Sequence, residues 1–465
     1  MKYLSTRGEA PPLGFVETLL AGLAPDGGLY CPAAWPRLSP DEIAAFAGRP
    51  YAEVAAAILA PFVGDEIAPD TLRALCADAY AGFDHPAVAP LVQLSPDRFL
   101  LELFHGPTLA FKDVAMQILG RLYAHVLAAR GRAMTIVCAT SGDTGGAAVE
   151  AFAGLDHVRV VVLFPEGRIS EVQRRFMTTA PQANVRTAAI AGDFDDCQAI
   201  LKALFQDEAF AREVDLSAVN SINLARIIAQ SVYFFTAAVA LGAPARAVDF
   251  GVPTGNFGDA FAGYAAWLMG LPIGRILVAT NANDIVARAL QTGLYRRGNT
   301  RATQSPAMDI QVASNFERLF FECAGRDAAG TAAGFRAFAT DGALRIPPGV
   351  LTAMREVFLG TAVDEEQTTR AIADTFRAAG RLIDPHTAVA IAGADRAGRR
   401  TGAAPLVVIS TAHPAKFPDA VSAAAGVTPP PPPAVLARAA LPERIDRLPA
   451  EVEAIKRYVR AFAAS

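Results

Sequence analysis

Short apolar runs, bounded by turn residues, recur along the chain from about residue 97. They are continuous and rich in β-branched side chains, which is typical of strands in a parallel sheet covered on both faces. Helical patterns separate them, so the sequence predicts an α/β fold with doubly wound layers. The predicted strands are residues 99–103, 135–139, 158–164, 185–190, 248–252, 276–279 and 406–409.

The helical patterns are amphipathic in the middle of the chain and rich in Ala and Leu near its start. The segment 113–130 places its apolar residues on one stripe at i, i+3, i+4 spacing, and Asp113 falls in its first turn, where a negative charge suits the helix dipole. Residues 41–47 and 52–60 predict helices in an N-terminal region. Segment 227–245 is uncharged and long enough to span a membrane, but its polar residues and α/β surroundings favour a buried helix.

Near the end of the chain, residues 429–433 are all proline and predict a stiff polyproline spacer. The stretch 442–464 beyond it predicts a charged surface helix.

Composition narrows the possible classes of function. Hydrophobic residues make up 52% of the 465 residues and charged residues 19%, as in a folded globular protein. The net charge is −4, and Lys and Arg are scattered, so we expect no nucleic-acid partner. The five cysteines lie far apart without metal-binding spacing, and the first residues lack the apolar core of a signal peptide. These features predict a cytoplasmic protein without a structural metal.

Lys112 follows an apolar run and a Gly106-Pro107 turn, at the start of the helix predicted over 113–130. Burial disfavours the charged form of a lysine and makes its amine a nucleophile, as a Schiff base with an aldehyde cofactor requires. Taken alone, the residue reads equally well as a surface lysine at a helix start.

Two glycine turns connect a predicted strand to a helix, Thr140–Gly146 and Pro253–Asp259. Backbone N–H groups at such turns bind anions, although an ordinary capped helix is the alternative for the first. The second is neither a Walker loop nor a GxGxxG motif. One turn could hold a cofactor phosphate and the other a substrate carboxylate.

Two further clusters carry polar side chains. Asn220, Ser221, Asn223 and Arg226 suit phosphate recognition, with a helix N-terminus bearing an exposed arginine as the alternative. The strand 406–409 ends in hydroxyls, where ligands of open α/β sheets bind. The segments 305–310 and 384–388 predict loops, and His386 is interpreted as structural.

Taken together, the residues resemble the threonine synthase family in its fungal and bacterial form. The resemblance covers nearly the whole chain and rests on ordered blocks at residues 3–8, 26–30, 104–113, 140–145, 220–230, 253–259, 283–285, 305–310, 314–318, 384–388 and 411–417. It departs from expectation at Asp143, where the wider group often has Asn, at Leu224, where a Trp is expected, and in the proline tract.

The resemblance implies a fold type II pyridoxal-phosphate enzyme. It implies an N-terminal, mainly helical domain (1–85), a large cofactor-binding α/β domain (86–131 and 245–425), a small α/β domain (132–244), and a linker with a C-terminal helix (426–465). Lys112 would carry the cofactor. Its phosphate would lie against Gly255, Asn256, Phe257, Gly258 and Asp259, and Thr411 would face the pyridine nitrogen. The resemblance also implies that Thr140, Ser141, Gly142, Asp143 and Thr144 receive the substrate carboxylate, and that Asn220, Ser221 and Arg226 hold the substrate phosphate.

The implied activity is that of a lyase which converts O-phospho-L-homoserine and water to L-threonine and phosphate, the last step of threonine biosynthesis. We expect a small-molecule substrate, no membrane and no obligate protein partner. One alternative is a dehydratase or β-replacement enzyme of the same fold acting on serine or threonine, against which the cluster 220–226 argues. A second is a protein that binds cofactor or phospho-ligands without turnover, against which the intact Lys112 argues.

Overall fold

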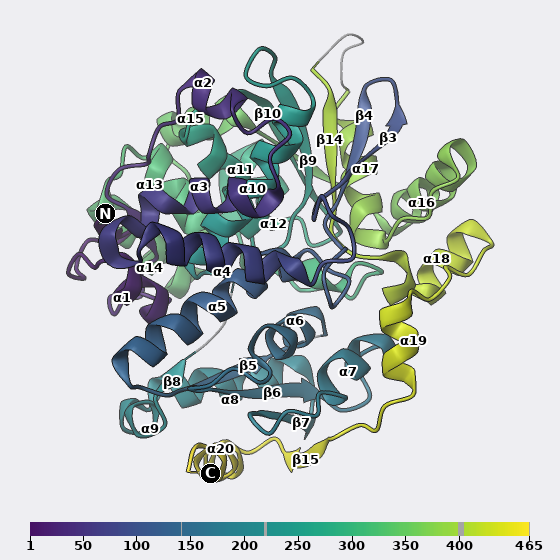
Figure 1. Cartoon of the computed structure of the whole chain (residues 1–465). Helices are drawn as coiled ribbons and strands as arrows, with labels where there is room; N and C mark the ends of the chain where they lie inside the picture. Colours follow the sequence, from purple (N-terminus) through teal and green to yellow (C-terminus); the bar gives the residue numbers. More distant parts are fainter. Residues whose placement is uncertain (141, 218–220, 399–403, 465) are drawn as a thin grey trace. The chain divides into compact units, whose positions relative to one another are not determined.

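The computed structural model describes residues 1–140, 142–217, 221–398 and 404–464 (Figure 1). The chain divides into two compact units, and each unit consists of two separate stretches of sequence. Unit 1 contains residues 1–105 and 221–429, and unit 2 contains residues 106–220 and 430–465. These limits differ from the domain boundaries expected from the sequence, because the N-terminal region belongs to unit 1 and the end of the chain returns to unit 2.

Unit 1 is built on a six-stranded sheet with the order β13-β10-β9-β14-β4-β3. Its strands are parallel except at the edge, where β3 pairs with β4 in antiparallel fashion. The strands span β3 (Leu91–Ser95), β4 (Arg98–Glu102), β9 (Val248–Pro253), β10 (Ile273–Thr280), β13 (Phe358–Ala362) and β14 (Leu406–Ser410).

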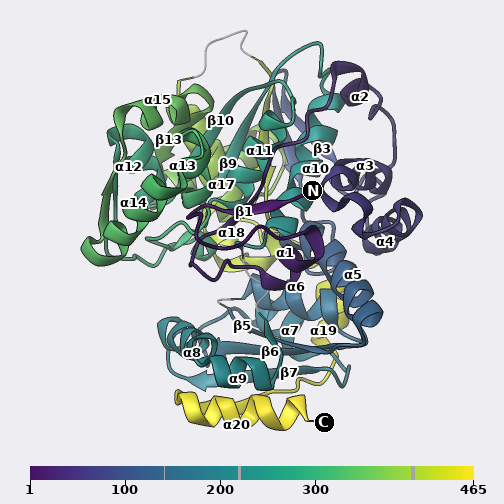
Figure 2. The ribbon, with the colours of Figure 1, turned by 90° about the vertical axis from the view of Figure 1, so that its left-hand side faces the viewer.

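Helices cover both faces of this sheet (Figures 1 and 2). Helix α17 (Pro385–Arg396) packs on β9, β10 and β14, and α16 (Glu365–Ala379) and α18 (Pro418–Ala425) extend that layer. Helix α11 (Gly258–Leu268) packs on β9 and β10 and against α10 (Leu224–Ala240), whose Phe234 makes an edge-to-face contact with Phe250 of β9. Helix α10 is almost wholly buried, as predicted for segment 227–245. Among the described residues, no helix is both long and apolar enough to cross a bilayer.

The remaining elements of unit 1 are shorter or peripheral. The N-terminal helices α3 and α4 pack against each other, and α3 also packs on α10. The bounds are β1 (Tyr3–Ser5), α1 (Phe15–Ala21), β2 (Tyr30–Pro32), α2 (Pro40–Ala44), α3 (Tyr51–Val63), α4 (Pro69–Ala81), α12 (Ile285–Thr292), β11 (Leu294–Arg296), α13 (Phe316–Cys323), α14 (Ala328–Asp341), β12 (Ala343–Arg345) and α15 (Pro348–Val357).

Unit 2 contains a wholly parallel five-stranded sheet with the order β15-β7-β6-β5-β8. Its strands are β5 (Met134–Ala139), β6 (Val158–Pro165), β7 (Val185–Ala191), β8 (Leu216–Ser217) and β15 (Asp446–Pro449). All seven strands predicted from the sequence are therefore confirmed, each within a few residues of its expected ends. The strands β3, β8, β13 and β15 were not predicted, because they are short or lie at sheet edges.

Two helical layers also cover the sheet of unit 2. One consists of α8 (Phe194–Gln206), α9 (Glu208–Glu213) and α20 (Val452–Ala463), which share a buried core with β5, β6 and β7. The other contains α6 (Asp143–Phe152), which packs against both α5 (Lys112–Arg130) and α7 (Glu171–Thr178); α7 in turn contacts α19 (Pro433–Ala439). Helix α5 begins one residue before the predicted helix and ends with it.

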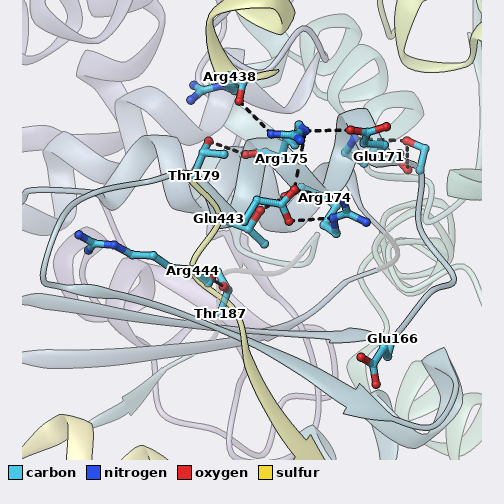
Figure 3. A network of polar contacts seen from close by, with 12 residues as sticks. Glu166, Glu171, Arg174, Arg175, Thr179, Thr187, Arg438, Glu443 and Arg444 are labelled. Atoms are coloured by element: carbon cyan, nitrogen blue, oxygen red, sulfur yellow. Dashed lines mark hydrogen bonds and ion pairs between the residues drawn. The ribbon is translucent and has the colours of Figure 1, made fainter. Parts of the chain in front are cut away.

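The end of the chain is part of the architecture of unit 2 (Figure 3). The single helix predicted over 442–464 is wrong: the segment forms β15, which pairs with β7, and then α20. Glu443 accepts two hydrogen bonds from Arg174 of α7, at 2.9 and 3.0 Å, and the backbone N–H of Arg444 donates to the Thr178 carbonyl at 2.7 Å. Pairing with an existing sheet edge makes a strand of a polar sequence that carries no strand pattern of its own.

Candidate active site

Lys112 is the first residue of α5 and is buried, with 8% of its surface exposed. The turn before it is fixed by Asp113, whose carboxylate accepts hydrogen bonds from the backbone N–H and the hydroxyl of Thr108, both at 2.7 Å. The ammonium lies 5.0 Å from the centre of the Phe111 ring. The structure thus supports a buried lysine at a helix start rather than the surface lysine of the alternative interpretation.

The turn between β5 and α6 is closed by its own threonine. The hydroxyl oxygen of Thr140 accepts hydrogen bonds from the backbone N–H groups of Gly142 at 2.9 Å and Gly145 at 3.0 Å. These bonds engage two backbone donors of the turn, although Gly142, the N-cap residue of α6, provides no side-chain cap. Thr144 lies in the first turn of α6 and is partly exposed, and Ser141 lies outside the described residues.

Asp143, the first residue of α6, brings a carboxylate to Lys112 within unit 2. Its Oδ2 lies 3.7 Å from Nζ of Lys112, and both side chains are buried. Its Oδ1 accepts a hydrogen bond from the side-chain amide of Gln173 on α7 at 3.0 Å. No sequence pattern pointed to Gln173, since only the packing of α7 against α6 brings the two residues together.

The turn between β9 and α11 in unit 1, residues 255–258, has backbone N–H groups without an acceptor among the described residues, and we call it the open turn. Phe257, at the N-cap of α11, has a positive φ of 61° and a ring buried near Phe316 and Phe358. Within the described part of the chain, the backbone N–H groups of Asn256, Phe257 and Gly258 find no hydrogen-bond acceptor. Open N–H groups at the start of a helix suit an anion, because the helix dipole adds to them.

Two segments distant in sequence hold this open turn. Asn315 donates from its backbone and its side chain to the Asn256 carbonyl, at 3.0 and 3.1 Å. A Cβ on Gly255 would lie 2.9 Å from the carbonyl oxygen of Ala307, so only glycine permits this approach. The N–H of Ala307 in turn donates to Nε2 of His386 at 3.2 Å. His386 is structural, as interpreted from the sequence, but what it supports is the open turn.

Asp259 follows the open turn, and its side chain is hydrogen-bonded to a residue of α10. The hydroxyl of Tyr233 donates to Oδ1 of Asp259, and Oδ2 is buried without a hydrogen bond. Burial raises the pKa of the Asp259 carboxyl to about 7, although Tyr233 and Arg226 act in the opposite direction. Only the backbone of Asp259 is therefore available to a phosphate, since its carboxylate is engaged with Tyr233.

Arg226 lies in the first turn of α10 and is buried, with 4% of its surface exposed. Burial lowers the pKa of its guanidinium to about 10, and the nearby Asp259 and Tyr233 oppose that shift. Its guanidinium forms no hydrogen bond or ion pair with any described residue. The exposed arginine of the alternative interpretation is excluded, and a buried guanidinium of this kind suits an anionic ligand.

The other predicted site residues have simpler surroundings. Thr411, just after β14, is 6% exposed, and its hydroxyl has no hydrogen-bond partner among the described residues. The carbonyl of Ser221 accepts a hydrogen bond from Asn315 at 2.9 Å, and Asn223 caps α10 by accepting from the N–H of Ala225 at 3.0 Å. Asn220 lies outside the described residues.

Each unit, taken by itself, has groups that suit a part of pyridoxal phosphate. The three open N–H donors suit its phosphate, a buried primary amine suits its aldehyde, and the Thr411 hydroxyl suits its ring nitrogen. No group of His, Cys, Asp and Glu that could hold a metal ion occurs among the described residues.

The comparison with family models covers most of the chain. Residues 2–80 match the model described as threonine synthase N terminus, residues 85–335 match that of pyridoxal-phosphate dependent enzymes, and residues 387–459 match that described as threonine synthase, C-terminal. The chain belongs to the threonine synthase family of pyridoxal-phosphate-dependent enzymes. The resemblance seen in the sequence is thereby confirmed.

Individual threonine synthases are similar over their whole length. The enzyme of Pseudomonas aeruginosa is 49% identical over 460 residues, which cover 99% of this chain and 98% of the relative. The structure of pyridoxal-phosphate-bound threonine synthase from Brucella melitensis matches with a TM-score of 0.97 at 50% identity, covering 100% of both chains. The yeast threonine synthase structure matches with a TM-score of 0.94 at 37% identity, covering 100% of this chain and 99% of the yeast chain. The predicted α/β fold type II class is confirmed by these matches.

Proposed function

We propose that this chain is a threonine synthase that converts O-phospho-L-homoserine and water to L-threonine and phosphate. The observation that carries the proposal is the buried Lys112 beside Asp143, in a chain that matches threonine synthases from end to end. The reaction requires a nucleophilic amine that can also move protons, and a buried lysine beside a carboxylate can do both.

Each residue group has a defined task in this reaction. Pyridoxal phosphate, when bound, supplies a conjugated ring that takes up the electrons released at the substrate carbon. Lys112 holds the cofactor before substrate arrives and afterwards moves protons at Cα and Cβ, so that phosphate leaves from Cγ and water adds at Cβ. The turn 255–258 would hold the cofactor phosphate through its open N–H groups, and the Thr411 hydroxyl would face the ring nitrogen without forcing it to stay protonated.

The substrate would be held at both of its charged ends. In the proposal, the turn 140–144 receives its carboxylate, and Ser221, Arg226 and the undescribed Asn220 receive its phosphate. The buried guanidinium of Arg226, without a hydrogen bond to any described residue, favours a phosphorylated substrate over the serine or threonine of a dehydratase. We also expect a reducing, cytoplasmic compartment, because all five cysteines are free and four of them are buried.

The test is phosphate release from O-phospho-L-homoserine, measured beside the release of ammonia from serine and from threonine. A threonine synthase releases phosphate and forms threonine, whereas faster turnover of an unphosphorylated amino acid would support the dehydratase alternative.

Lys112→Ala is expected to lower kcat by at least about a thousand-fold, since general acid–base catalysis and cofactor attachment are lost together. Lys202→Ala, at an exposed position of α8, is the matched control and should keep its activity. Near-normal turnover by Lys112→Ala would remove this lysine from the mechanism.

A further inference from the structure

A chain of four polar side chains in unit 2 ends at the amine of Lys112. Ser170 is the N-cap of α7, and its hydroxyl oxygen accepts a hydrogen bond from the backbone N–H of Gln173 at 3.2 Å. The amide of Gln173 donates to Oδ1 of Asp143 at 3.0 Å, and Oδ2 of Asp143 faces Nζ of Lys112 at 3.7 Å. Gln173, Asp143 and Lys112 are all buried, with 7–8% of their surface exposed.

The direction of the Gln173 amide is fixed from both of its ends. Ser170 donates its hydroxyl proton to Oε1 of Gln173 at 3.2 Å, so the amide oxygen turns towards the cap of α7. Nε2 then points to Asp143, where a carboxylate can only accept. In consequence Oδ1 of Asp143 is engaged by a neutral donor and Oδ2 remains directed at the ammonium.

Gly142 provides the space in which the amide of Gln173 lies. A Cβ on Gly142 would lie 2.5 Å from the amide carbon of Gln173 and 2.7 Å from its nitrogen and oxygen. Gly142 also has a φ of +140°, which side chains rarely adopt. A side chain at position 142 would therefore occupy the space that the Gln173 amide needs to reach Asp143.

The other charged side chains on the neighbouring helices are engaged elsewhere. Asp113 accepts from Thr108, Arg174 and Arg175 pair with Glu443, Arg175 also pairs with Glu171, and Arg438 pairs with Glu150. Among the described residues of unit 2, Asp143 is thus a carboxylate that faces the lysine, and Gln173 donates a hydrogen bond to that carboxylate.

We propose that Gln173 is a positioning residue: it holds the Asp143 carboxylate against Lys112 and so sets the pH range in which this amine accepts and releases its proton. The inference rests on the proposed function in one respect, that Lys112 is the amine that carries the cofactor. Nothing in the sequence motifs around Lys112 or Asp143 includes Gln173, which enters only through the packing of α7 on α6.

The experiment measures the reactivity of Lys112 towards acetic anhydride as a function of pH, in the full-length, cofactor-free protein, with the modified lysine quantified by mass spectrometry. Only the uncharged amine reacts, so loss of the facing carboxylate should speed labelling below the midpoint of the profile. Asp143→Asn should raise the labelling rate by about ten-fold or more, and Gln173→Ala by about five-fold, the size expected for one ordinary hydrogen bond, since the carboxylate itself remains. Gln173→Glu, of the same shape, adds negative charge and should slow labelling instead.

The deciding measurement is the double variant. If Gln173 acts through Asp143, adding Gln173→Ala to Asp143→Asn should change the labelling rate no further. An equal effect of Gln173→Ala in both backgrounds would overturn the proposal, as would the same acceleration from Gln117→Ala, which removes another buried glutamine of unit 2 that is bonded to Arg121. Circular dichroism checks that each variant is folded, and Gln173→Glu replaces Gln173→Ala if the latter is not.

The labelling needs neither substrate nor cofactor, so its outcome is separable from that of the phosphate-release assay. A coupled Gln173–Asp143 effect without phosphate release would sustain the positioning role and refute the proposed function. Phosphate release without that coupling would support the proposed function and refute the positioning role of Gln173.

Discussion

Two turns of this protein share one local pattern and differ in use. Each joins a parallel strand to a helix and places a Gly-Asp pair at the helix start, Gly142-Asp143 in unit 2 and Gly258-Asp259 in unit 1. In the first, the Thr140 hydroxyl satisfies two backbone donors, and the aspartate faces Lys112. In the second, three donors have no acceptor in the described part of the chain, and the aspartate accepts a hydrogen bond from Tyr233.

The difference comes from what packs behind each turn. Gln173 lies behind the first turn and holds its carboxylate towards the amine. Backbone of the Ala307 segment lies behind the second, and its aspartate is buried beside α10. The aspartate of the same dipeptide therefore faces a lysine in one turn and a tyrosine in the other, which a motif search cannot distinguish.

The largest of the effects expected in unit 1 tests whether Arg226 binds the substrate phosphate, as distinct from the cofactor phosphate proposed for the open turn. Arg226→Ala should lower kcat/KM for O-phospho-L-homoserine by about ten- to a hundred-fold, because a guanidinium hydrogen-bonded to phosphate contributes about 1.5–3 kcal/mol. Arg226→Lys should recover only part, since a point charge cannot reproduce the fork. Any slow activity on unphosphorylated amino acids should be nearly spared. Equal losses on both kinds of substrate would instead assign Arg226 to the support of Asp259 and the turn.

A smaller effect is expected from adding a side chain at Gly255, where the open turn lies against the backbone of Ala307. Gly255→Ala places a Cβ 2.9 Å from the Ala307 oxygen, so the turn must shift and its N–H groups lose their alignment. We expect the dissociation constant of pyridoxal phosphate to rise by at least about ten-fold, measured by fluorescence titration of the cofactor-free protein. Gly349→Ala, where an added Cβ meets no atom within 4 Å, is the control. Unchanged cofactor binding by Gly255→Ala would mean that the open turn binds something other than the cofactor.

The smallest expected effect concerns the aspartate of the open turn. Burial raises the pKa of Asp259 to about 7, so the folded protein keeps a proton that the unfolded chain releases above about pH 4. The stability that this group contributes is full below that pH and is lost as the pH rises through 7. Asp259→Asn lacks this loss, so its unfolding free energy relative to the parent should rise by about 1 kcal/mol per pH unit from pH 4.5 to 6.5.

Urea unfolding of the cofactor-free protein at several pH values measures this difference. Asp65→Asn, at an exposed position of unit 1, serves as the comparison variant. A difference between Asp259→Asn and the parent that stays constant over this range would show that Asp259 is ionised in the folded protein.

The sequence by itself determined the strands that form the centre of each sheet, the start of α5 at Lys112, and the family. Central strands are buried on both faces, so their apolar runs are visible without any knowledge of their neighbours. The two glycine turns were visible for a similar reason, because strand, turn and helix start are adjacent in the chain. The domain boundaries were harder to predict from the sequence. The end of the chain joins unit 2 through β15, which acquires its strand conformation only by pairing with β7.

Only the tertiary structure decided how the polar side chains are used. Gln173 lies 30 residues from Asp143, and His386 lies 79 residues from Ala307, yet each pair forms a hydrogen bond. Asp143 and Asp259 each follow a glycine at a helix start, and their different contacts follow from the helices packed against them. Hydrophobic periodicity reports the free energy of burying one segment, whereas the direction of a buried carboxylate is set by donors that arrive from other segments.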